Sequence, residues 1–391
     1  MVKPDIPDLL LTVDLGGSLT KIAAATPGGK YLLLGLASEV ATIPRATLAE
    51  IQSGYWGEGN LESKIWVATK AGESYAVGRF AREKFRSQID LKLSKTELAV
   101  PKILSALWLL RERLDFPNIF YARLAVLLPA GECSSIDQQE LIELLKPALA
   151  GFATPSGKMT VKLFANPVIK PEGAGLLLHH KSLQSEEFSA KSVGILGIGF
   201  RNANLLICQD GTVAESDRLT CDLGFHALIQ RCKELAGSTV DDFSLATVIA
   251  EAGQNINSII IGRYLQKINK ERRKDSLIEA ITKSQTLYWS LLTNWFKQVQ
   301  IHNLDQLVLY GGTSQYFRER LEKYLEGKVE RLSWHAEAIV PPELLAQGVF
   351  EPEQLGLDLR FIDCWCLFQF ILNRQTGYKP YKEIELALTE V

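Results

Sequence analysis

The sequence predicts an α/β protein built from two domains of related architecture. An apolar run, a glycine turn and a second apolar run follow one another at residues 9–25, which is typical of two strands joined by a short connection. The same succession returns at residues 192–208. Segments with helical periodicity separate the strand-like runs in both halves. The chain has 391 residues, a length that favours two to three domains.

The composition argues against several classes of protein. With 43 Lys and Arg residues against 45 Asp and Glu residues, the formal charge of −2 argues against a generally basic nucleic-acid binder. Hydrophobic residues make up 47% of the chain, too many for a disordered or fibrous protein. No apolar run approaches the roughly 20 residues of a membrane span, and the N-terminus carries no apolar signal core. We therefore expect a soluble, cytoplasmic protein that does not contact a membrane.

The six cysteines are too sparse for a disulfide scaffold. Cys364 and Cys366 stand one residue apart among aromatic residues, and this spacing differs from the gap of two residues that is usual at zinc sites. Free cysteine is often buried, so both are interpreted as core residues. The five histidines show no ligand spacing either. We expect no structural metal.

The first half of the chain is expected to be rich in strands. Residues 9–13, 19–25 and 31–36 predict a tight meander, because their connections are too short for a parallel crossover through a helix. Residues 64–69 and 74–77 predict a hairpin around Gly72. Further strands are predicted at 120–128 and 158–164, and helices at 78–84, 102–114, 137–149 and 174–180.

The second half is expected to begin after the polar segment 184–191 and to repeat the opening of the first. Strands are predicted at 192–196 and 204–208, with residues 197–199 as the turn between them and 209–211 as a hairpin turn. A short strand is predicted at 307–310, and helices at 224–234, 238–252, 275–299, 314–325 and 361–372.

A glycine turn between an aspartate and a lysine is the first candidate site. Gly16 and Gly17 allow backbone N–H groups to approach phosphate oxygens closely. Ser18 adds a hydroxyl donor, and Lys21 adds a charge for the β- and γ-oxygens. Asp14, at the end of the first strand, fits a residue that holds a water on phosphate-bound Mg²⁺. The same residues also fit an ordinary β-turn followed by a solvated lysine, since short glycine motifs are weak signals.

A second pair of glycines, at the start of a predicted helix, is the second candidate site. Gly311 and Gly312 follow a short apolar run, so the helix dipole would favour an anion there. Tyr316 and Phe317 are placed to flank a planar base. The alternative is a helix N-cap at Thr313 or Ser314 with the aromatic residues in the core.

Five segments occur in the order of the nucleotide-site segments of the actin superfamily: 14–21, 171–173, 197–204, 311–313 and 345–348. Gly78 and Ala81 also match the N-terminal domain of actin-like proteins. Over essentially its whole length the chain resembles bacterial actin-like ATPases of the ParM/StbA plasmid-segregation type, within the superfamily of actin, sugar kinases and heat-shock chaperones. The resemblance implies an α/β, actin-like fold with two related RNase H-like domains flanking a nucleotide cleft. Domain I would comprise residues 1–170 and 346–391, and domain II residues 171–345.

The resemblance also implies roles for residues of domain I. Asp14 would contact Mg²⁺ through water, as a catalytic and metal-linked residue. Glu172, in the first connection between the domains, would orient or activate the attacking water, because phosphoryl transfer needs mainly a positioned nucleophile and charge neutralisation. The nucleotide-contacting residues of this domain would be Gly16, Gly17, Ser18, Thr20 and Lys21.

In domain II the resemblance implies contacts with the α-phosphate and the nucleoside. Gly311, Gly312 and Thr313 would lie on the α-phosphate and the adenosine, and Tyr316 would lie near the base. Ala346 and Gly348 belong to the second connection, where small residues allow the domains to shear.

One motif departs from the family's pattern. The second phosphate loop of the family reads Asp-x-Gly-Gly-x-Thr-x-Asp, whereas residues 197–204 read Gly-Ile-Gly-Phe-Arg-Asn-Ala-Asn. Gly197 and Asn204 stand where the family has aspartates, which predicts slow or differently organised hydrolysis. Arg201 either pairs with the γ-phosphate or lies on the surface. The residues expected to contact nucleotide from this loop are Gly197, Gly199, Arg201 and Asn202.

The function that the resemblance implies is an ATP hydrolase that polymerises. Head-to-tail assembly of identical subunits is a heterologous contact that does not close, so it gives a filament. In the ParM type such filaments separate plasmids through a DNA-bound adaptor, so contact with DNA would be indirect. The alternatives are a small-molecule kinase of the same superfamily, which the loss of both loop carboxylates weakens, and a nucleotide-binding scaffold that does not hydrolyse ATP.

Two lysine-rich segments have less specific interpretations. Residues 267–274 form a strongly basic run, interpreted as a solvated helix end or as a contact to a filament neighbour or an acidic adaptor. Lys92, Lys95 and Lys102 are interpreted as solvated surface, with a partner-facing role as the alternative.

Overall fold

The chain forms two compact units, each with a sheet and a core of its own. The computed structural model describes residues 3–54, 60–88, 91, 93–184, 190–237, 241–350 and 356–381. The first unit comprises Met1–Leu183 and Ala338–Val391, and the second comprises Gln184–Glu337. The C-terminal part of the chain therefore belongs with the N-terminal part.

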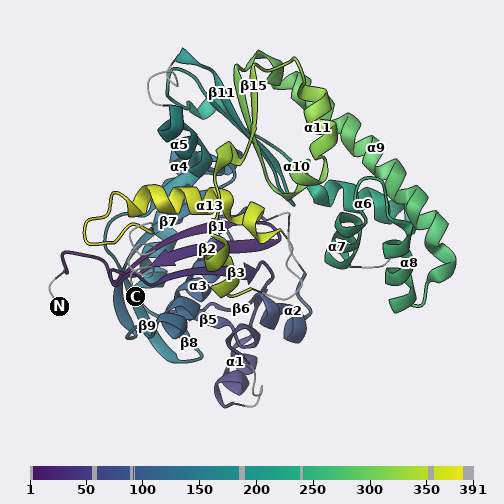
Figure 1. Cartoon of the computed structure of the whole chain (residues 1–391). Helices are drawn as coiled ribbons and strands as arrows, with labels where there is room; N and C mark the ends of the chain where they lie inside the picture. Colours follow the sequence, from purple (N-terminus) through teal and green to yellow (C-terminus); the bar gives the residue numbers. More distant parts are fainter. Residues whose placement is uncertain are drawn as a thin grey trace, which may run out of the picture. The chain divides into compact units, whose positions relative to one another are not determined.

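The first unit is organised around the strands that open the chain (Figure 1). β1 (Leu9–Leu15) pairs antiparallel with β2 (Leu19–Ala25), and β2 pairs antiparallel with β3 (Tyr31–Ala37). The predicted meander is therefore confirmed. On its other side β1 pairs in parallel with β7 (Ile119–Leu128), which also pairs in parallel with β10 (Val168–Pro171). As a result β1, β7 and β10 all run in the same direction.

A group of shorter strands extends this sheet. Beyond β7 the order continues through β9 (Gly157–Leu163), β8 (Phe152–Thr154), β5 (Trp66–Thr69), β6 (Ser74–Val77) and β4 (Val40–Thr42). β5 and β6 are antiparallel, so the predicted hairpin is confirmed. Gly72 has a φ of +92° in its turn, a conformation that glycine adopts without strain.

Helices cover both faces of β1 and β2. α3 (Ala99–Leu114) lies on one face and α13 (Leu357–Leu372) on the other (Figure 1). Leu9, Leu11 and Val13 belong to the core on the α3 side. Because successive strand residues point to opposite faces, Asp14 points to the α13 side. The other helices of this unit are α1 (Arg45–Gln52), α2 (Arg79–Phe85), α4 (Ser135–Leu149), α5 (Ala174–Gln184) and α12 (Pro342–Gln347).

The second unit repeats the strand order of the first. β11 (Val193–Ile198), β12 (Ala203–Cys208) and β13 (Arg218–Cys221) are successive antiparallel neighbours. β11 also pairs in parallel with β14 (Gln306–Tyr310), and β14 with β15 (Arg331–Trp334). The order β13-β12-β11-β14-β15 thus matches β3-β2-β1-β7-β10 in direction as well as in sequence order. This is the related architecture that the repeated opening predicted.

The helices of the second unit pack against one face of this sheet. Leu196, Ile198 and Leu205 lie in a core shared with α6 and α9. The helices are α6 (Phe225–Ala236), α7 (Asp242–Ala252), α8 (Ser258–Lys267), α9 (Lys274–Gln298), α10 (Gly312–Tyr316) and α11 (Arg318–Leu325). In the part of the chain that the structure describes, no helix is both long enough and apolar enough to cross a lipid bilayer.

Two predictions of local structure in the second unit are wrong. Gly197 and Ile198 lie in β11, so the turn to β12 begins at Gly199. Residues 314–325 do not form one helix, because α10 and α11 are separated at Phe317. The Phe317 side chain is fully buried and stacks on Tyr288, with ring centroids 5.2 Å apart, so the chain bends to place it in the core. α8 was not predicted.

The prediction of a solvated lysine surface at 92–102 is also wrong where it can be tested. Lys95 is 8% exposed and Lys102 is 4% exposed. Lys92 lies outside the described residues. By contrast, the interpretation of Cys364 and Cys366 as core residues is confirmed, since both are buried and free. Burial of a lysine requires a partner, and the partner of Lys95 proves to be a predicted site residue.

Candidate functional site

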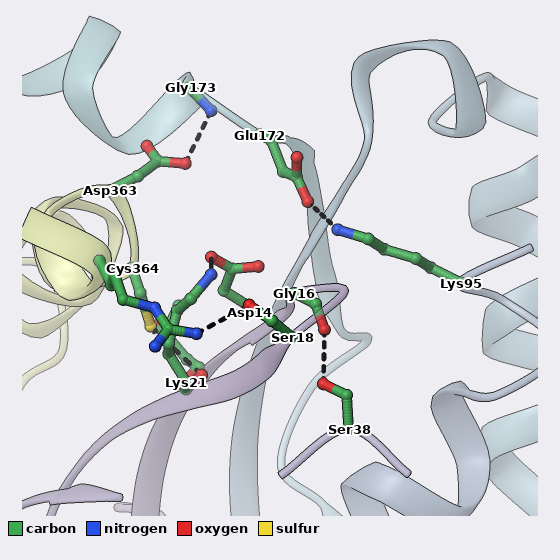
Figure 2. A network of polar contacts seen from close by, with 12 residues as sticks. Asp14, Gly16, Ser18, Lys21, Ser38, Lys95, Glu172, Gly173, Asp363 and Cys364 are labelled. Atoms are coloured by element: carbon green, nitrogen blue, oxygen red, sulfur yellow. Dashed lines mark hydrogen bonds and ion pairs between the residues drawn. The ribbon is translucent and has the colours of Figure 1, made fainter. Parts of the chain in front are cut away.

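The carboxyl ends of three parallel strands gather the predicted site residues of the first unit at one edge of its sheet. Asp14 of β1 lies opposite Leu127 of β7, and Pro171 of β10 lies opposite Leu128. The turn after β1 and the connection after β10 therefore leave the sheet at the same edge. Figure 2 shows the resulting polar cluster, which includes Asp14, Gly16, Ser18, Lys21 and Glu172. Two segments that are distant in the sequence thus contribute to one site.

The turn after β1 folds tightly around an ion pair. The Lys21 Nζ lies 2.6 Å from Asp14 Oδ2. The Gly16 N–H donates to the Asp14 carbonyl at 2.9 Å, and the Ser38 hydroxyl donates to the Gly16 carbonyl at 2.7 Å. A Cβ at position 16 would lie 2.3 Å from the Leu19 carbonyl oxygen and 2.7 Å from the Lys21 Nζ. Glycine is therefore needed here because a side chain would collide with the backbone carbonyl of Leu19.

Strand alternation separates Thr20 from this cluster. Asp14 and Lys21 are directly paired across β1 and β2 and point to the face that α13 covers. Thr20, the neighbour of Lys21, points to the opposite face and is 0% exposed. The expected contact between Thr20 and nucleotide stays a prediction, and this placement argues against it, because neighbouring residues of a strand point to opposite faces.

One oxygen of Asp14 is left for a further contact. Oδ2 pairs with Lys21, whereas Oδ1 is buried and has no hydrogen-bond partner among the residues that the structure describes. Burying such an oxygen is unfavourable, and a cation or its bound water would compensate. Within the described ranges, no group of three or more His, Cys, Asp and Glu side chains could hold a metal alone. Asp14 therefore fits a Mg²⁺ ion that is held mainly by waters and substrate phosphates.

Glu172 follows β10 directly and is held by Lys95 (Figure 2). The Lys95 ammonium and the Glu172 carboxylate form an ion pair whose side chains are 9% and 14% exposed. The backbone on both sides is also fixed, since the Lys95 N–H donates to Glu132 Oε2 at 2.8 Å and the Glu172 N–H donates to the Leu128 carbonyl at 2.6 Å. Because separating a buried ion pair leaves an unpaired charge, this arrangement holds the Glu172 carboxylate in one place.

α13 brings a second carboxylate to the start of α5. Asp363 Oδ2 accepts the Gly173 N–H at 2.7 Å, and Oδ1 accepts the Leu176 N–H at 3.0 Å. N–H groups at a helix start have no partner within their own helix, so Asp363 caps α5 from outside. Burial raises the pKa of Asp363 to about 7. The two hydrogen bonds from backbone N–H groups lower this pKa, whereas the charges of Asp14 and Glu172 raise it further.

Replacing Asp363 with asparagine should change the pH dependence of stability. The folded-state pKa lies above the ordinary value of 3.8, so the folded unit keeps a proton that the unfolded chain releases. The free energy of unfolding should therefore fall as the pH rises from about 4 to about 7, by on the order of 4 kcal/mol. Urea unfolding at several pH values, followed by circular dichroism, measures this, and Asp363→Asn should lose this part of the slope. Parallel pH profiles for the two proteins would contradict the assignment.

Two more residues of α13 contact the turn after β1 and its strands. Arg360 Nη2 donates to the Ser18 hydroxyl oxygen at 2.8 Å. The Cys364 thiol lies 3.6 Å from the carbonyl oxygens of Thr12 and Lys21. Burial lowers the pKa of Arg360 to about 10, and the charge of Asp14 acts against this shift. Arg360, Asp363 and Cys364 have the spacing of one helix face, so one face of α13 completes the cluster.

The second unit brings its two predicted segments into contact. The Thr313 hydroxyl donates to the Gly199 carbonyl at 2.7 Å, and the Ile198 N–H donates to Ser314 Oγ at 3.2 Å. Gly311 has a φ of +98°, and a Cβ there would lie 2.5 Å from the Ile198 carbonyl oxygen. Glycine is thus required at position 311 by both its conformation and this close approach.

The residues of the second loop differ in how well they fit a ligand contact. Gly197 lies in β11, where a Cβ would lie 2.3–2.4 Å from ring atoms of Tyr310, so packing accounts for this glycine. Asn204 accepts a hydrogen bond from β13 at 2.7 Å. Asn202 is 6% exposed, and its Oδ1 has no hydrogen-bond partner in the described ranges. Gly199, Arg201 and Asn202 lie at the turn after β11, whereas Gly197 lies within the strand, and its expected contact with nucleotide stays a prediction.

Tyr316 is packed within the second unit. Its hydroxyl accepts a hydrogen bond from Gln285 at 2.7 Å and donates to the Gly253 carbonyl at 3.2 Å. Its ring meets Phe225 edge-on, with centroids 5.1 Å apart, and burial raises the pKa of its phenol. α10 has only five residues, so its dipole adds little to an anion site before Gly312. These contacts favour the core interpretation of Tyr316 over a platform for a base.

Four residues of the cluster were missed by sequence reasoning. For Arg360 and Asp363 a signal was present, because charged residues three positions apart in a largely apolar helix need partners when the helix is buried. Lys95 carried no such signal, since its neighbours in the sequence are polar. Ser38 follows a strand and resembles any loop serine. All four are positioned by contacts between distant parts of the chain.

Comparisons with solved structures identify the fold. No protein-family model and no curated protein sequence matches the chain. The actin-like protein Alp7A matches with a TM-score of 0.57 and 13% identity, over 97% of this chain and 98% of that one. A Bacillus thuringiensis ParM with AMPPNP gives 0.56 and 12%, over 94% and 99%. Ta0583, an archaeal actin homologue, gives 0.54 and 16%, over 94% and 99%. The chain therefore has the actin-like α/β fold that the order of its five segments predicted.

Proposed function

We propose that the chain is an actin-like ATPase that binds ATP with Mg²⁺ and assembles into filaments. The observation that carries the proposal is the polar cluster of the first unit (Figure 2). In this cluster the glycine turn after β1, the Lys21 ammonium and the Asp14 carboxylate, which has one oxygen without a partner in the described ranges, lie near Glu172. This combination supplies backbone donors and a cation for phosphates, with a carboxylate for the ion that accompanies them. The actin-like fold and the ParM relative with AMPPNP support the same ligand class.

Each residue of the cluster has a task in this proposal. The turn at Gly16, Gly17 and Ser18 would hold the β- and γ-phosphates, and Lys21 would neutralise their charge. Mg²⁺, when bound, would offset the charge of the phosphate oxygens, with Asp14 holding it through water. Glu172 would orient the attacking water, and Lys95 would keep its carboxylate in position. Phosphoryl transfer depends mainly on positioning and charge neutralisation, which these groups provide.

Residues of the second unit are proposed to contact nucleotide as well. Gly311, Gly312 and Thr313 are proposed for the α-phosphate and the nucleoside, and the turn at Arg201 and Asn202 is proposed for a phosphate oxygen. The unpartnered Oδ1 of Asn202 supports a ligand at that turn. The domain boundaries at 170/171 and 345/346 remain predictions and belong to this proposal.

Filament formation and its biological role are the finer parts of the proposal. A head-to-tail contact between identical subunits extends without limit, which gives a nucleotide-dependent filament. We propose that this filament acts in the cytoplasm and separates plasmid copies through a DNA-bound adaptor. The formal charge of −2 supports an indirect contact with DNA.

A nucleotide-binding scaffold that does not hydrolyse ATP is the second candidate. Two observations favour it: the second loop carries no carboxylate, and Glu172 is committed to an ion pair with Lys95. A small-molecule kinase is less well supported, because the same loop would have to supply a catalytic aspartate near the γ-phosphate.

Nucleotide-dependent sedimentation tests the proposal. The purified chain should pellet at high speed with ATP and Mg²⁺, but not without nucleotide, and phosphate release should follow assembly in the same tubes. GTP and ADP serve as comparisons for base and phosphate preference. Light scattering gives the time course of assembly, and a titration with fluorescent ATP measures binding independently.

The outcomes separate the candidate functions. Polymer without phosphate release would favour the scaffold. ATP consumption that requires an added sugar or acid, with no polymer, would favour the kinase. If no polymer forms with any nucleotide over a wide range of protein concentration, the filament part of the proposal fails. If fluorescent ATP does not bind, the nucleotide part fails as well.

A further inference from the structure

We propose that Arg360, on the C-terminal helix α13, is a phosphate-binding residue of the nucleotide site. This inference rests on the proposed function and adds a contact that none of the glycine segments contains. Arg360 lies outside all five segments that predicted the site, yet its guanidinium reaches the turn that would hold the β- and γ-phosphates.

Arg360 feels the charge of Asp14 but forms no ion pair with any residue that the structure describes. Lys21 is paired with Asp14, and Lys95 is paired with Glu172. Among the residues that the structure describes, the guanidinium donates only to the neutral hydroxyl of Ser18, at 2.8 Å. Removing a cation from water costs free energy, and a hydrogen bond to a neutral group offsets only part of that cost. An arriving anion would provide that compensation.

The geometry of arginine fits phosphate in particular. The guanidinium presents five N–H donors in a plane and binds phosphate oxygens through two parallel hydrogen bonds. One donor of Arg360 holds Ser18, which leaves others for a ligand bound at the same turn. Ser18 and Arg360 would then contact the same phosphate from two elements of the first unit.

α13 is held firmly enough to present this side chain in one place. Asp363 accepts two N–H groups at the start of α5, three residues along α13 from Arg360. Gly175 of α5 lies so close to α13 that a Cβ would be 2.1 Å from the Asp363 carbonyl oxygen. A donor that is positioned before the ligand arrives loses little conformational freedom on binding, which favours affinity.

A structural role for Arg360 makes a different prediction from a phosphate-binding role. Ser18 belongs to the turn that would hold the β- and γ-phosphates, so the loss of a brace for this turn would also weaken ATP more than AMP. A double-mutant cycle with Ser18→Ala separates the two roles. If Arg360 acts only through Ser18, Arg360→Gln should cause no further loss of ATP affinity once Ser18 is alanine. If Arg360 binds a terminal phosphate directly, Arg360→Gln should weaken ATP in the Ser18→Ala background as well.

The experiment compares Arg360→Gln, alone and combined with Ser18→Ala, with Ser18→Ala, with Arg360→Lys and with a matched control, Arg374→Gln. Arg374 follows the end of α13 and lies over the Phe370 ring, away from the polar cluster. Dissociation constants for ATP, ADP and AMP are measured by competition against fluorescent ATP, and thermal unfolding checks the fold. We expect Arg360→Gln to bind ATP about 10- to 100-fold more weakly, with AMP changed by less than about 3-fold. Arg360→Lys keeps the positive charge but lacks the planar pair of guanidinium donors, so we expect an intermediate loss of ATP affinity. Arg374→Gln should bind ATP as tightly as the unmodified chain.

Each result has a defined meaning. Three results would overturn the inference while leaving the proposed function intact: unchanged ATP affinity in Arg360→Gln, equal losses for ATP and AMP, or no further loss of ATP affinity when Arg360→Gln is added to Ser18→Ala. If the unmodified chain binds no nucleotide, the proposed function fails and the inference fails with it. If Arg360→Gln does not fold, Arg360→Lys is measured in the same two backgrounds, and a loss of ATP affinity no larger than the loss of AMP affinity would overturn the role.

Discussion

Replacing Gly175 with alanine should lower the free energy of unfolding of the first unit by about 3 kcal/mol. Gly175 lies in the first turn of α5, where this helix meets α13. A Cβ at this position would lie 2.1 Å from the Asp363 carbonyl oxygen and 2.7 Å from the Leu367 backbone nitrogen. Both atoms belong to the backbone of a buried helix, so neither can move unless α13 is displaced.

A matched glycine in the second unit should respond differently. Gly262 lies inside α8, and the nearest neighbour of a Cβ there would be the flexible side chain of Lys274, at 3.7 Å. Alanine is favoured over glycine inside a helix by about 1 kcal/mol, so Gly262→Ala should be neutral or stabilising. Urea unfolding followed by circular dichroism measures both variants. A midpoint for Gly175→Ala at or above that of the unmodified chain would mean that α5 tolerates a side chain against α13.

The strands of both units could be predicted because their signals are local. The runs at 9–13 and 19–25 are apolar, and a connection of a few residues allows only an antiparallel pair. The same argument gave β11 and β12. The predicted turn was misplaced, because glycine is typical of turns, whereas β11 continues through Gly197 to Ile198. What the sequence could not show is that the Tyr310 ring of the neighbouring strand occupies the space beside this glycine.

The half of the cluster supplied by α13 could not be predicted in this way. Arg360 and Ser18 are 342 positions apart, and Asp363 and Gly173 are 190 positions apart. Hydrophobic periodicity indicates that such a helix is buried, but it does not identify the partner of each polar side chain. Lys95 is a similar case, since its burial depends on contacts with Glu132 and Glu172, which follow the ends of β7 and β10.

Strand alternation explains the different outcomes for Lys21 and Thr20. Both belong to the same short segment, and the resemblance to actin-like proteins gave them the same role. The cross-strand pair of Asp14 with Lys21 selects one face of β2 for the cluster. Thr20 then points into the core on the other side. The pleat of the strand therefore decides which side chains of this segment point to the polar cluster.

Replacing Glu172 with glutamine should slow phosphate release by about 100-fold or more, while ATP affinity stays within about threefold of the unmodified chain. The amide keeps the volume of the carboxylate and a carbonyl oxygen for Lys95, whereas alanine would leave that buried ammonium without a partner. It removes the charge that would orient the attacking water. Single-turnover phosphate release and titration with fluorescent ATP measure the two quantities separately. Glu143→Gln is the matched control, because Glu143 is an exposed carboxylate on α4 of the same unit.

The same variant connects hydrolysis to filament lifetime. If hydrolysis weakens contacts between subunits, filaments of Glu172→Gln should persist after excess ATP is removed, whereas those of the unmodified chain and of Glu143→Gln should disassemble. Light scattering after dilution measures this decay. Slow phosphate release combined with rapid disassembly would separate hydrolysis from filament turnover. Phosphate release at the unmodified rate would show that a group other than Glu172 orients the water, and Lys95 would then serve to stabilise the fold alone.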